Sequence, residues 1–162
     1  MPLVPFDALP DDARVWVFAA DRPLTPDAEQ RLLGEVDAWL ARWNAHGQPL
    51  TCARAWRDDQ FLAIAVDQRD AHASGCSIDG MFRVIKGLEP VLGASLVGGG
   101  RVLWRGRDGS VQVGSRDDFS DLAARGDVSP DTRVFDPTVA TAGDWRTRFE
   151  RPAAESWHAA LM

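Results

Sequence analysis

Hydrophobic and polar residues in the first part of the chain predict a strand followed by a helix. Residues 14–20 are β-branched and aromatic and have acidic residues on either side, which is typical of a buried strand. Thr25 and Pro26 supply a cap and a first-turn proline, and apolar residues then recur at spacings of three and four. We expect this helix to stop near Gly47.

Two more strands and a second helix are predicted next. Residues 51–57 and 61–66 have strand composition and meet at Asp58-Asp59, which predicts a hairpin. The second helix starts close to Cys76, and Pro90 should kink or end its last turn. Its apolar residues predict a buried stripe made of Ile78, Met81, Phe82, Ile85, Leu88 and Leu92.

The three glycines at 98–100 are the clearest break in the chain and predict a linker. Beyond them, residues 102–104 and 111–113 flank an Asp-Gly turn as a second hairpin, and a capped short helix begins at Ser115. A further strand, a helix and a tail follow. We therefore divide the chain into an α+β body (1–97), the linker (98–100), a small unit (101–150) and a docking tail (151–162).

The order β-α-β-β-α-β predicts an α+β fold, specifically a ferredoxin-like βαββα(β) sandwich with a small C-terminal hairpin-helix unit. In that topology the strands stand in the order 4-1-3-2, so the first and third are central and apolar on both faces. Residues 14–20 and 61–66 are the two continuous apolar runs, whereas residues 51–57 alternate with charge, as an edge strand does.

Composition narrows the functional classes. The 162 residues carry a net charge of −6, and Lys86 is the only lysine. This acidic balance argues against nucleic-acid partners and anionic membranes, which are bound by clustered positive charge. The longest apolar run is too short for a membrane helix, and the first residues show no signal-peptide pattern. We expect a cytoplasmic protein in which Cys52 and Cys76 are reduced.

Several short phrases, spread over nearly the whole chain, resemble one family of small bacterial proteins. They are Val4-Pro-Phe, Arg14-Val-Trp, Trp43-Asn-Ala-His46-Gly47, Ala73-Ser-Gly-Cys76-Ser-Ile-Asp79, Val128-Ser-Pro-Asp-Thr, Val134-Phe and Ser156-Trp-His158. Members of that family are often labelled "ABC transporter ATPase", and the resemblance implies no established activity.

The residues themselves exclude a P-loop ATPase. A Walker A motif needs Gly-Lys-Ser/Thr after a glycine-rich loop, and Lys86 lies between Ile85 and Gly87. The glycines at 98–100, followed by Arg101, come after a helix and before a strand, which is the wrong order for a phosphate loop at a helix N-terminus. We therefore reject ATPase activity.

Residues 102–145 resemble, more weakly, the bacterial variety of GYF domain, an adaptor module. The resemblance rests on Val113-Gly-Ser-Arg-Asp-Asp-Phe119, Gly126-Asp-Val-Ser-Pro-Asp-Thr-Arg-Val134-Phe and Trp145. It implies a similar backbone, and GYF domains in general hold proline-rich peptides on exposed aromatic side chains. Trp104 and Trp157 are candidate binding residues. The Gly-Tyr-Phe signature itself is missing, and the chain contains no tyrosine.

Cys76 is the main candidate for chemistry because it lies at the start of the second helix. Amide donors and the helix dipole can activate a thiol there, and Asp79 would orient a base or cap the turn. The alternative, which we favour, is a tight turn in which Ser74 or Ser77 caps the helix and Cys76 is a packed apolar side chain. Ser74, Gly75 and Ser77 are also the candidate binding residues of this turn.

Three histidines could act as a base. The predicted topology brings His46 to the same sheet edge as residues 72–79, and Cys, His and Asp together suit thiol catalysis or a metal. The spacing matches no zinc motif, so we predict no metal and no cofactor. Capping of a helix end is the simpler role for His46, an exposed loop position suits His72, and docking of the tail through Trp157 is the simpler role for His158.

Two functions remain. The first, which we favour, is a non-catalytic binding or protein-interaction module with an unidentified protein or peptide partner, which could also form a homodimer. The alternative is a thiol-dependent enzyme or redox sensor that uses Cys76, with His46 or His158 as base and Asp79 as orienting residue.

Overall fold

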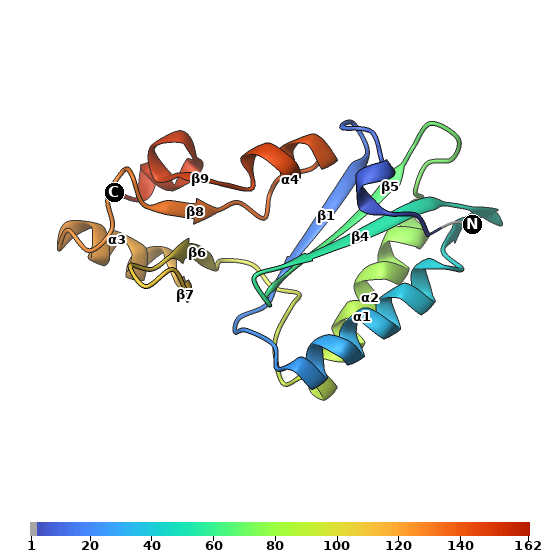
Figure 1. Ribbon diagram of the computed structural model, residues 1–162, viewed down its shortest axis with the longest axis horizontal. Helices are drawn as coiled ribbons and strands as arrows, with labels where there is room; N and C mark the ends of the chain where they lie inside the picture. Colours follow the sequence, from blue (N-terminus) through green and yellow to red (C-terminus); the bar gives the residue numbers. More distant parts are fainter. Residues whose placement is uncertain (1–2) are drawn as a thin grey trace.

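A computed structural model describes residues 3–162 and shows an α+β fold, as the sequence predicts. The first part contains three long strands and two long helices (Figure 1). They are β1 (Arg14–Ala19), α1 (Pro26–Leu40), β4 (Thr51–Arg57), β5 (Phe61–Asp67) and α2 (Gly75–Leu92). Among the described residues, no helix combines the length and the apolar character that crossing a membrane requires.

The second part forms its own antiparallel sheet in the order β7-β6-β8-β9. Its elements are β6 (Val102–Arg105), β7 (Val111–Gly114), α3 (Arg116–Ala124), β8 (Arg133–Phe135), α4 (Ala142–Arg148) and β9 (Glu150–Pro152). Short 3-10 turns cover Phe6–Ala8, Ala153–Glu155 and Trp157–Leu161. The residues predicted as a tail thus supply a strand and two turns to this unit.

The body sheet has the antiparallel order β1-β5-β4, with β5 in the centre and all seven of its residues buried. The expectation of four strands in the order 4-1-3-2 is not met, because β6 does not pair with β1. Both edges of β6 are occupied by β7 and β8, so β1 is an edge strand and not a central one. Within the described residues, the outer edge of β1 makes only an isolated antiparallel bridge, between Arg14 and Thr141.

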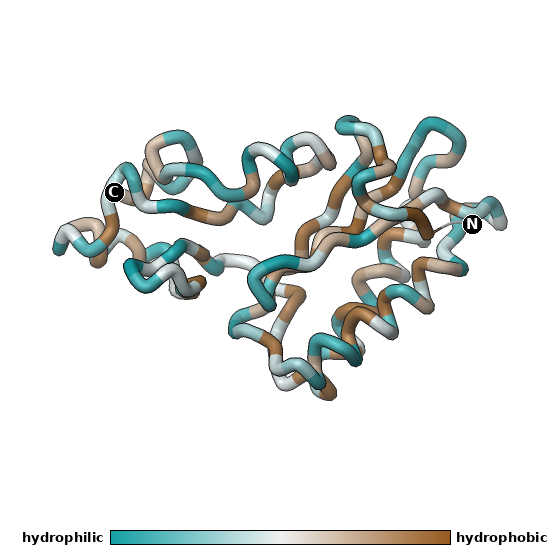
Figure 2. The backbone as a smooth tube through the Cα atoms, in the orientation of Figure 1, coloured by the Kyte–Doolittle hydropathy of each residue, from teal (hydrophilic) through white to brown (hydrophobic). Residues whose placement is uncertain are grey.

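The two faces of the body sheet are covered by different parts of the chain (Figure 1). α1 and α2 cover one face. The core that they enclose is mainly aliphatic, with Leu32, Leu40 and Ile64 among its buried residues, and it also contains a few tryptophans. The second unit covers the other face together with the segment before β1, and there Phe61 of β5 packs against Phe135 and Phe149. Figure 2 shows hydrophobic residues gathered along the strands and on the sheet-facing sides of α1 and α2.

Ion pairs rim the contact between the body and the second unit. The carboxylate of Glu150 in β9 accepts hydrogen bonds from Arg57 of β4 at 2.6 Å and from Arg105 of β6 at 2.9 Å. Arg105 also lies over the ring of Phe135, 5.0 Å from its centroid. The linker therefore joins two units that are held together by their own side chains.

Local differences from the predicted elements have simple causes. α1 ends at Leu40, earlier than expected, and His46 and Gly47 form the turn of a small hairpin, β2 (Asn44–Ala45) and β3 (Gln48–Pro49), with φ of 52° and 78°. His46 therefore does not cap a helix end.

One expectation for α2, the burial of Phe82, is also corrected. Pro90 lies within α2, which continues to Leu92 and ends at Gly93 with φ of 66°. Phe82 is 38% exposed instead of buried, because it packs at the rim of the core against Phe18 with ring centroids 5.2 Å apart.

Candidate functional site

The start of α2 is built by a reciprocal cap between two serines. Ser74 Oγ accepts a hydrogen bond from the Ser77 amide at 3.2 Å, and Ser77 Oγ accepts one from the Ser74 amide at 2.8 Å. The indole Nε1–H of Trp43 donates to the Ser77 carbonyl at 2.9 Å, which ties this turn to the end of the α1 segment. Both serines are thus engaged in structure, and Gly75 has open space around its Cα.

Cys76 and Asp79 are exposed on the outer side of this turn, so Cys76 is not the packed apolar side chain that we favoured. His46 and His72 are also exposed, and β2 contacts α2, so the turn that carries His46 lies near the start of α2. Over residues 3–162, however, no hydrogen bond joins Cys76 to an imidazole, and no group of histidine, cysteine and acidic residues could hold a metal. Cys76, Asp79, His46 and His72 are therefore at the same end of the body, but they do not form a catalytic or metal site.

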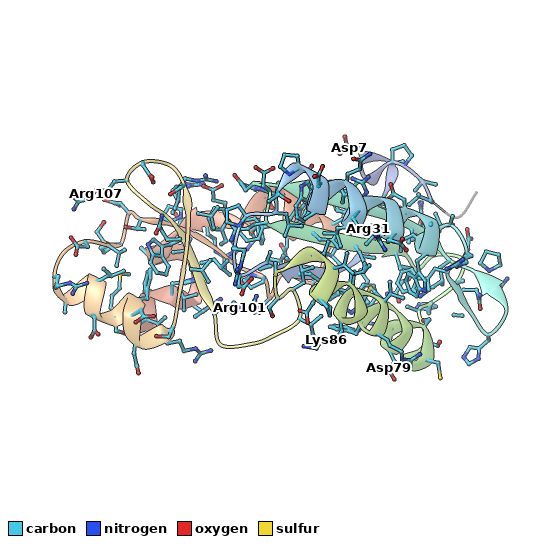
Figure 3. All side chains as sticks on the ribbon, turned by 90° about the horizontal axis from the view of Figure 1, so that it is seen from below. Asp7, Arg31, Asp79, Lys86, Arg101 and Arg107 are labelled. Carbon is cyan, nitrogen blue, oxygen red and sulfur yellow. The ribbon has the colours of Figure 1, made fainter. Side chains whose placement is uncertain are left out.

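His158 lies in a different part of the molecule. It is fully buried, stacks on Trp157 and packs edge-on against Phe119 of α3. Figure 3 shows Asp79, about one turn after Cys76, near the start of α2 and far from the second unit. His158 and Cys76 therefore do not belong to one site.

The surroundings of His158 explain its protonation state. Burial lowers its pKa to about 4, and the positive charge of Arg151 acts in the same direction, against the opposing effect of Asp136. Its Nδ1 lies 2.7 Å from Ser156 Oγ. A neutral imidazole in an aromatic pocket is an anchor for the tail, a role that the sequence assigned to Trp157.

Beside this anchor lies a buried ion pair that sequence reasoning missed. Arg151 Nη2 donates to Asp136 Oδ2 at 2.9 Å, while Asp136 Oδ1 accepts from Trp157 Nε1 at 3.1 Å and from Thr138. Burial alone would raise the pKa of Asp136, but the hydrogen bonds from Thr138, Trp157 and Arg151 lower it. The indole of Trp157 is thereby fixed at the edge of the second unit.

Trp157 forms part of a cavity of about 260 Å³ between the body and the second unit. The body contributes Val17 and Ala19 of β1, the linker contributes residues 98–100, and the second unit contributes Arg101, Arg116, Pro137 and Thr138. Figure 3 shows Arg101 at the junction of the two units. A neighbouring cavity of about 350 Å³ shares Val17, Pro137 and Thr138 and extends to Arg14, Trp16 and Phe82. We call the two together the β1 groove.

Arginines give the β1 groove its charge. Arg101 donates through Nη1 to the carbonyl of Ala19 at 2.6 Å and through Nη2 to Ser95 Oγ at 2.6 Å. Arg116 lies over the ring of Trp157, 5.4 Å from its centroid. In the described part of the chain, no aspartate or glutamate lines either cavity.

The sequence-predicted binding residues divide between these places. Trp157 lines the β1 groove, whereas Trp104 is buried in the core of the second unit against Phe119 and offers little surface. Ser74, Gly75 and Ser77 lie at the start of α2, on the far end of the body. The groove residue that the sequence singled out for binding was Trp157, whereas the glycines followed by Arg101 were interpreted as a linker; nothing local pointed to Arg116 or Val17.

No known protein family, curated protein or solved structure matches this chain. Its function must therefore be inferred from its own residues.

Proposed function

We propose that this chain is a non-catalytic binding module, a cytoplasmic protein-interaction domain that holds its partner in the β1 groove. One observation carries the proposal: a concave site between two firmly packed units is lined by aromatic side chains, arginines and a glycine-rich backbone, and by no carboxylate of residues 3–162. Concave sites with a few convergent polar groups are the usual location of binding.

The arrangement at the start of α2 favours binding over catalysis. Thiol catalysis needs a base within hydrogen-bond reach of the sulfur, and within the described part of the chain no imidazole is hydrogen-bonded to Cys76. The exposed thiol is the feature that supports the alternative, a thiol enzyme or redox sensor. The pH dependence of its reactivity distinguishes the two functions.

The finer fold assignments belong to the same proposal. Three body strands in the order β1-β5-β4 with two helices on one face are compatible with a ferredoxin-like unit that lacks its fourth strand. A hairpin, a helix and a returning strand in residues 102–135 are compatible with a GYF-like unit. In this chain the peptide surface would lie between the units, since Trp104 is buried.

Selection from a random-peptide library tests the proposal on the full chain. We expect enriched peptides that shift the amide signals of Val17 and Gly99 and the indole signal of Trp157 in nitrogen-15 spectra. Arg116→Glu should weaken this binding, while Arg42→Glu, which changes an exposed arginine outside the groove, should not. Failure to enrich any peptide, or binding that maps to the Cys76 end and ignores Arg116, would overturn it.

A further inference from the structure

The outer edge of β1 is partly occupied at both ends. At its start, the amide of Val15 donates to the Ala140 carbonyl at 2.8 Å, and the amide of Ala142 donates to the Ala13 carbonyl at 2.9 Å. At its end, the Ala19 carbonyl accepts from Arg101. These contacts show that the odd-numbered residues of β1 direct their backbone groups away from β5.

The middle of this edge is open. Because backbone direction alternates along a strand, the amide and carbonyl of Val17 also point outward. Residues 137–139 do not continue the pairing, since the amide of Thr138 turns back to Asp136 Oδ1 at 2.9 Å. Within the described residues, no hydrogen bond reaches the outward groups of Val17, which is half-buried and lines both cavities. An unpaired strand edge is a template for another strand.

The charge around this edge is one-sided, although the chain as a whole is acidic. Arg14, Arg101 and Arg116 line the groove, and none of them is in an ion pair with a carboxylate of residues 3–162. Most other basic side chains do form such pairs, for example Arg54 with Asp37 at 2.8 Å. The groove therefore carries positive charge that no ion pair within residues 3–162 neutralises, although Arg101 also interacts electrostatically with the carboxylate of Asp21.

Apolar surface accompanies the charge. Arg14 lies over the ring of Trp16 at 4.6 Å, and Phe82 of α2, 38% exposed, lines the same cavity. On the side of the second unit, Trp157 lies beneath Arg116. A strand placed along β1 would meet apolar and cationic groups on each of its faces.

We infer that an extended acidic segment of a partner protein binds in the β1 groove as an additional strand beside β1, through the backbone of Val17 and the side chains of Arg14, Arg101 and Arg116. This inference deepens the proposed function and rests on it. From Val15 to Ala19 the edge spans about 13 Å, so about four residues of the partner would pair. The main-chain bonds supply affinity and the arginines supply specificity.

Other occupants fit less well. A second copy of this chain that paired through its own β1 would bring the arginines of the two grooves together, and like charges across an interface are unfavourable. A basic peptide would lack the negative charge that complements the arginines. A proline-rich peptide would lack the backbone amide donors that pair with the edge of β1.

A designed peptide tests the inference on the full chain. The probe is an acetylated and amidated octapeptide that alternates valine and glutamate. Its controls are the same peptide with lysine for glutamate and the same peptide N-methylated at its two central valines. Nitrogen-15 spectra report where each peptide binds and how tightly.

We expect the acidic peptide to shift Val17 and the Trp157 indole, and the lysine and N-methylated peptides to bind at least about tenfold more weakly, because they lack the charge and the amide donors. Arg116→Glu should weaken binding about five- to tenfold, with Arg42→Glu as the unaffected control. Val17→Pro removes the outward donor while the bonds to β5 remain, and should have an effect as large as that of N-methylation.

The outcomes separate the inference from the function. Equal binding of the N-methylated or the lysine peptide in the groove overturns the acidic added strand and leaves the groove as a binding site. Library peptides that bind there without acidic residues do the same. If neither the probe nor any library peptide binds in the groove, both proposals fail. Tighter binding of an oligothymidylate, or a dimer in sedimentation that the peptide does not dissociate, would also overturn the inference.

Discussion

The two faces of the body sheet are covered in different ways. On one face, α1 and α2 come from the same segment as the strands and enclose a mainly aliphatic core. On the other, residues from the second unit contribute Phe135, Trp145 and Phe149, with arginine and glutamate side chains at the rim. The first face is made by neighbours in sequence and the second mainly by long-range contact, although Leu9 and Ala13, just before β1, also pack there. The second face therefore decides whether the β1 groove exists at all.

We expect the largest effects on stability from Phe149→Ala and Leu32→Ala, which test the two faces against each other. Each removes a fully buried side chain, one from each face, and each should lower the free energy of unfolding by about 3–5 kcal/mol. Because Phe149 contacts Phe61 across the interface, we expect one cooperative transition in both variants, with tryptophan fluorescence and circular dichroism coinciding in denaturant. An early separate transition in Phe149→Ala alone would show that the units fold independently.

Arg151→Met should be the next most damaging change, since it leaves the Asp136 carboxylate buried without its cation. We expect a loss of about 3 kcal/mol in chemical denaturation. The double variant Arg151→Met with Asp136→Leu removes the stranded charge and should recover most of that loss. No recovery would mean that the hydrogen bonds of Asp136 to Thr138 and Trp157 matter more than its ion pair.

The elements of the first face could largely be predicted because their signals are local. Thr25 caps α1 as expected, and β4 and β5 form the expected hairpin, in which residues 58–60 are the loop and Asp58 and Asp59 both have positive φ. The long-range features could not be predicted. β1 is an edge strand because β6 pairs with β7 and β8 and not with β1. The hydrophobic pattern within β1 carries no information about how β6 pairs.

The candidate site shows the same division. The sequence singled out Cys76, Asp79 and His46, whose residue types suggest chemistry, and the structure leaves them exposed and unconnected. It singled out Trp157 but not Arg116, because an arginine at the start of a short helix looks like any surface residue. Only the folded chain places the two side chains together.

The acid sensitivity of the second unit provides a smaller test. His158 has its pKa lowered by burial from 6.5 to about 4, so the unfolded chain takes up a proton first as the pH falls. The stabilisation is complete above pH 6.5 and is lost as the pH falls to about 4, at a cost of about 2–3 kcal/mol. His158→Leu should flatten the stability profile in this window, measured by denaturation at a series of pH values. An unchanged slope would contradict the burial of His158.

Glu150 acts in a more acidic window. Hydrogen bonds from Arg105 and Arg57 lower its pKa from 4.5 to about 2, against the opposing effect of burial. A depressed carboxyl pKa stabilises the fold above pH 4.5, and this contribution disappears as the pH falls towards 2. Partial exposure screens the interaction, so we expect about 1–2 kcal/mol. Glu150→Gln should remove this part of the profile and leave the His158 window intact.

The two cysteines differ clearly in exposure, and replacing the exposed one should have the smallest effect on stability. Cys52 is fully buried, its Sγ donates to the Leu40 carbonyl, and burial raises its pKa to about 12, whereas Cys76 is exposed. Native protein should react with one equivalent of dithionitrobenzoate, and Cys76→Ala should abolish that reaction while changing stability by less than about 0.5 kcal/mol. The rate against pH decides the alternative function: a thiol that titrates like an ordinary cysteine fits a surface residue, whereas one ionised below neutral pH would revive the thiol enzyme.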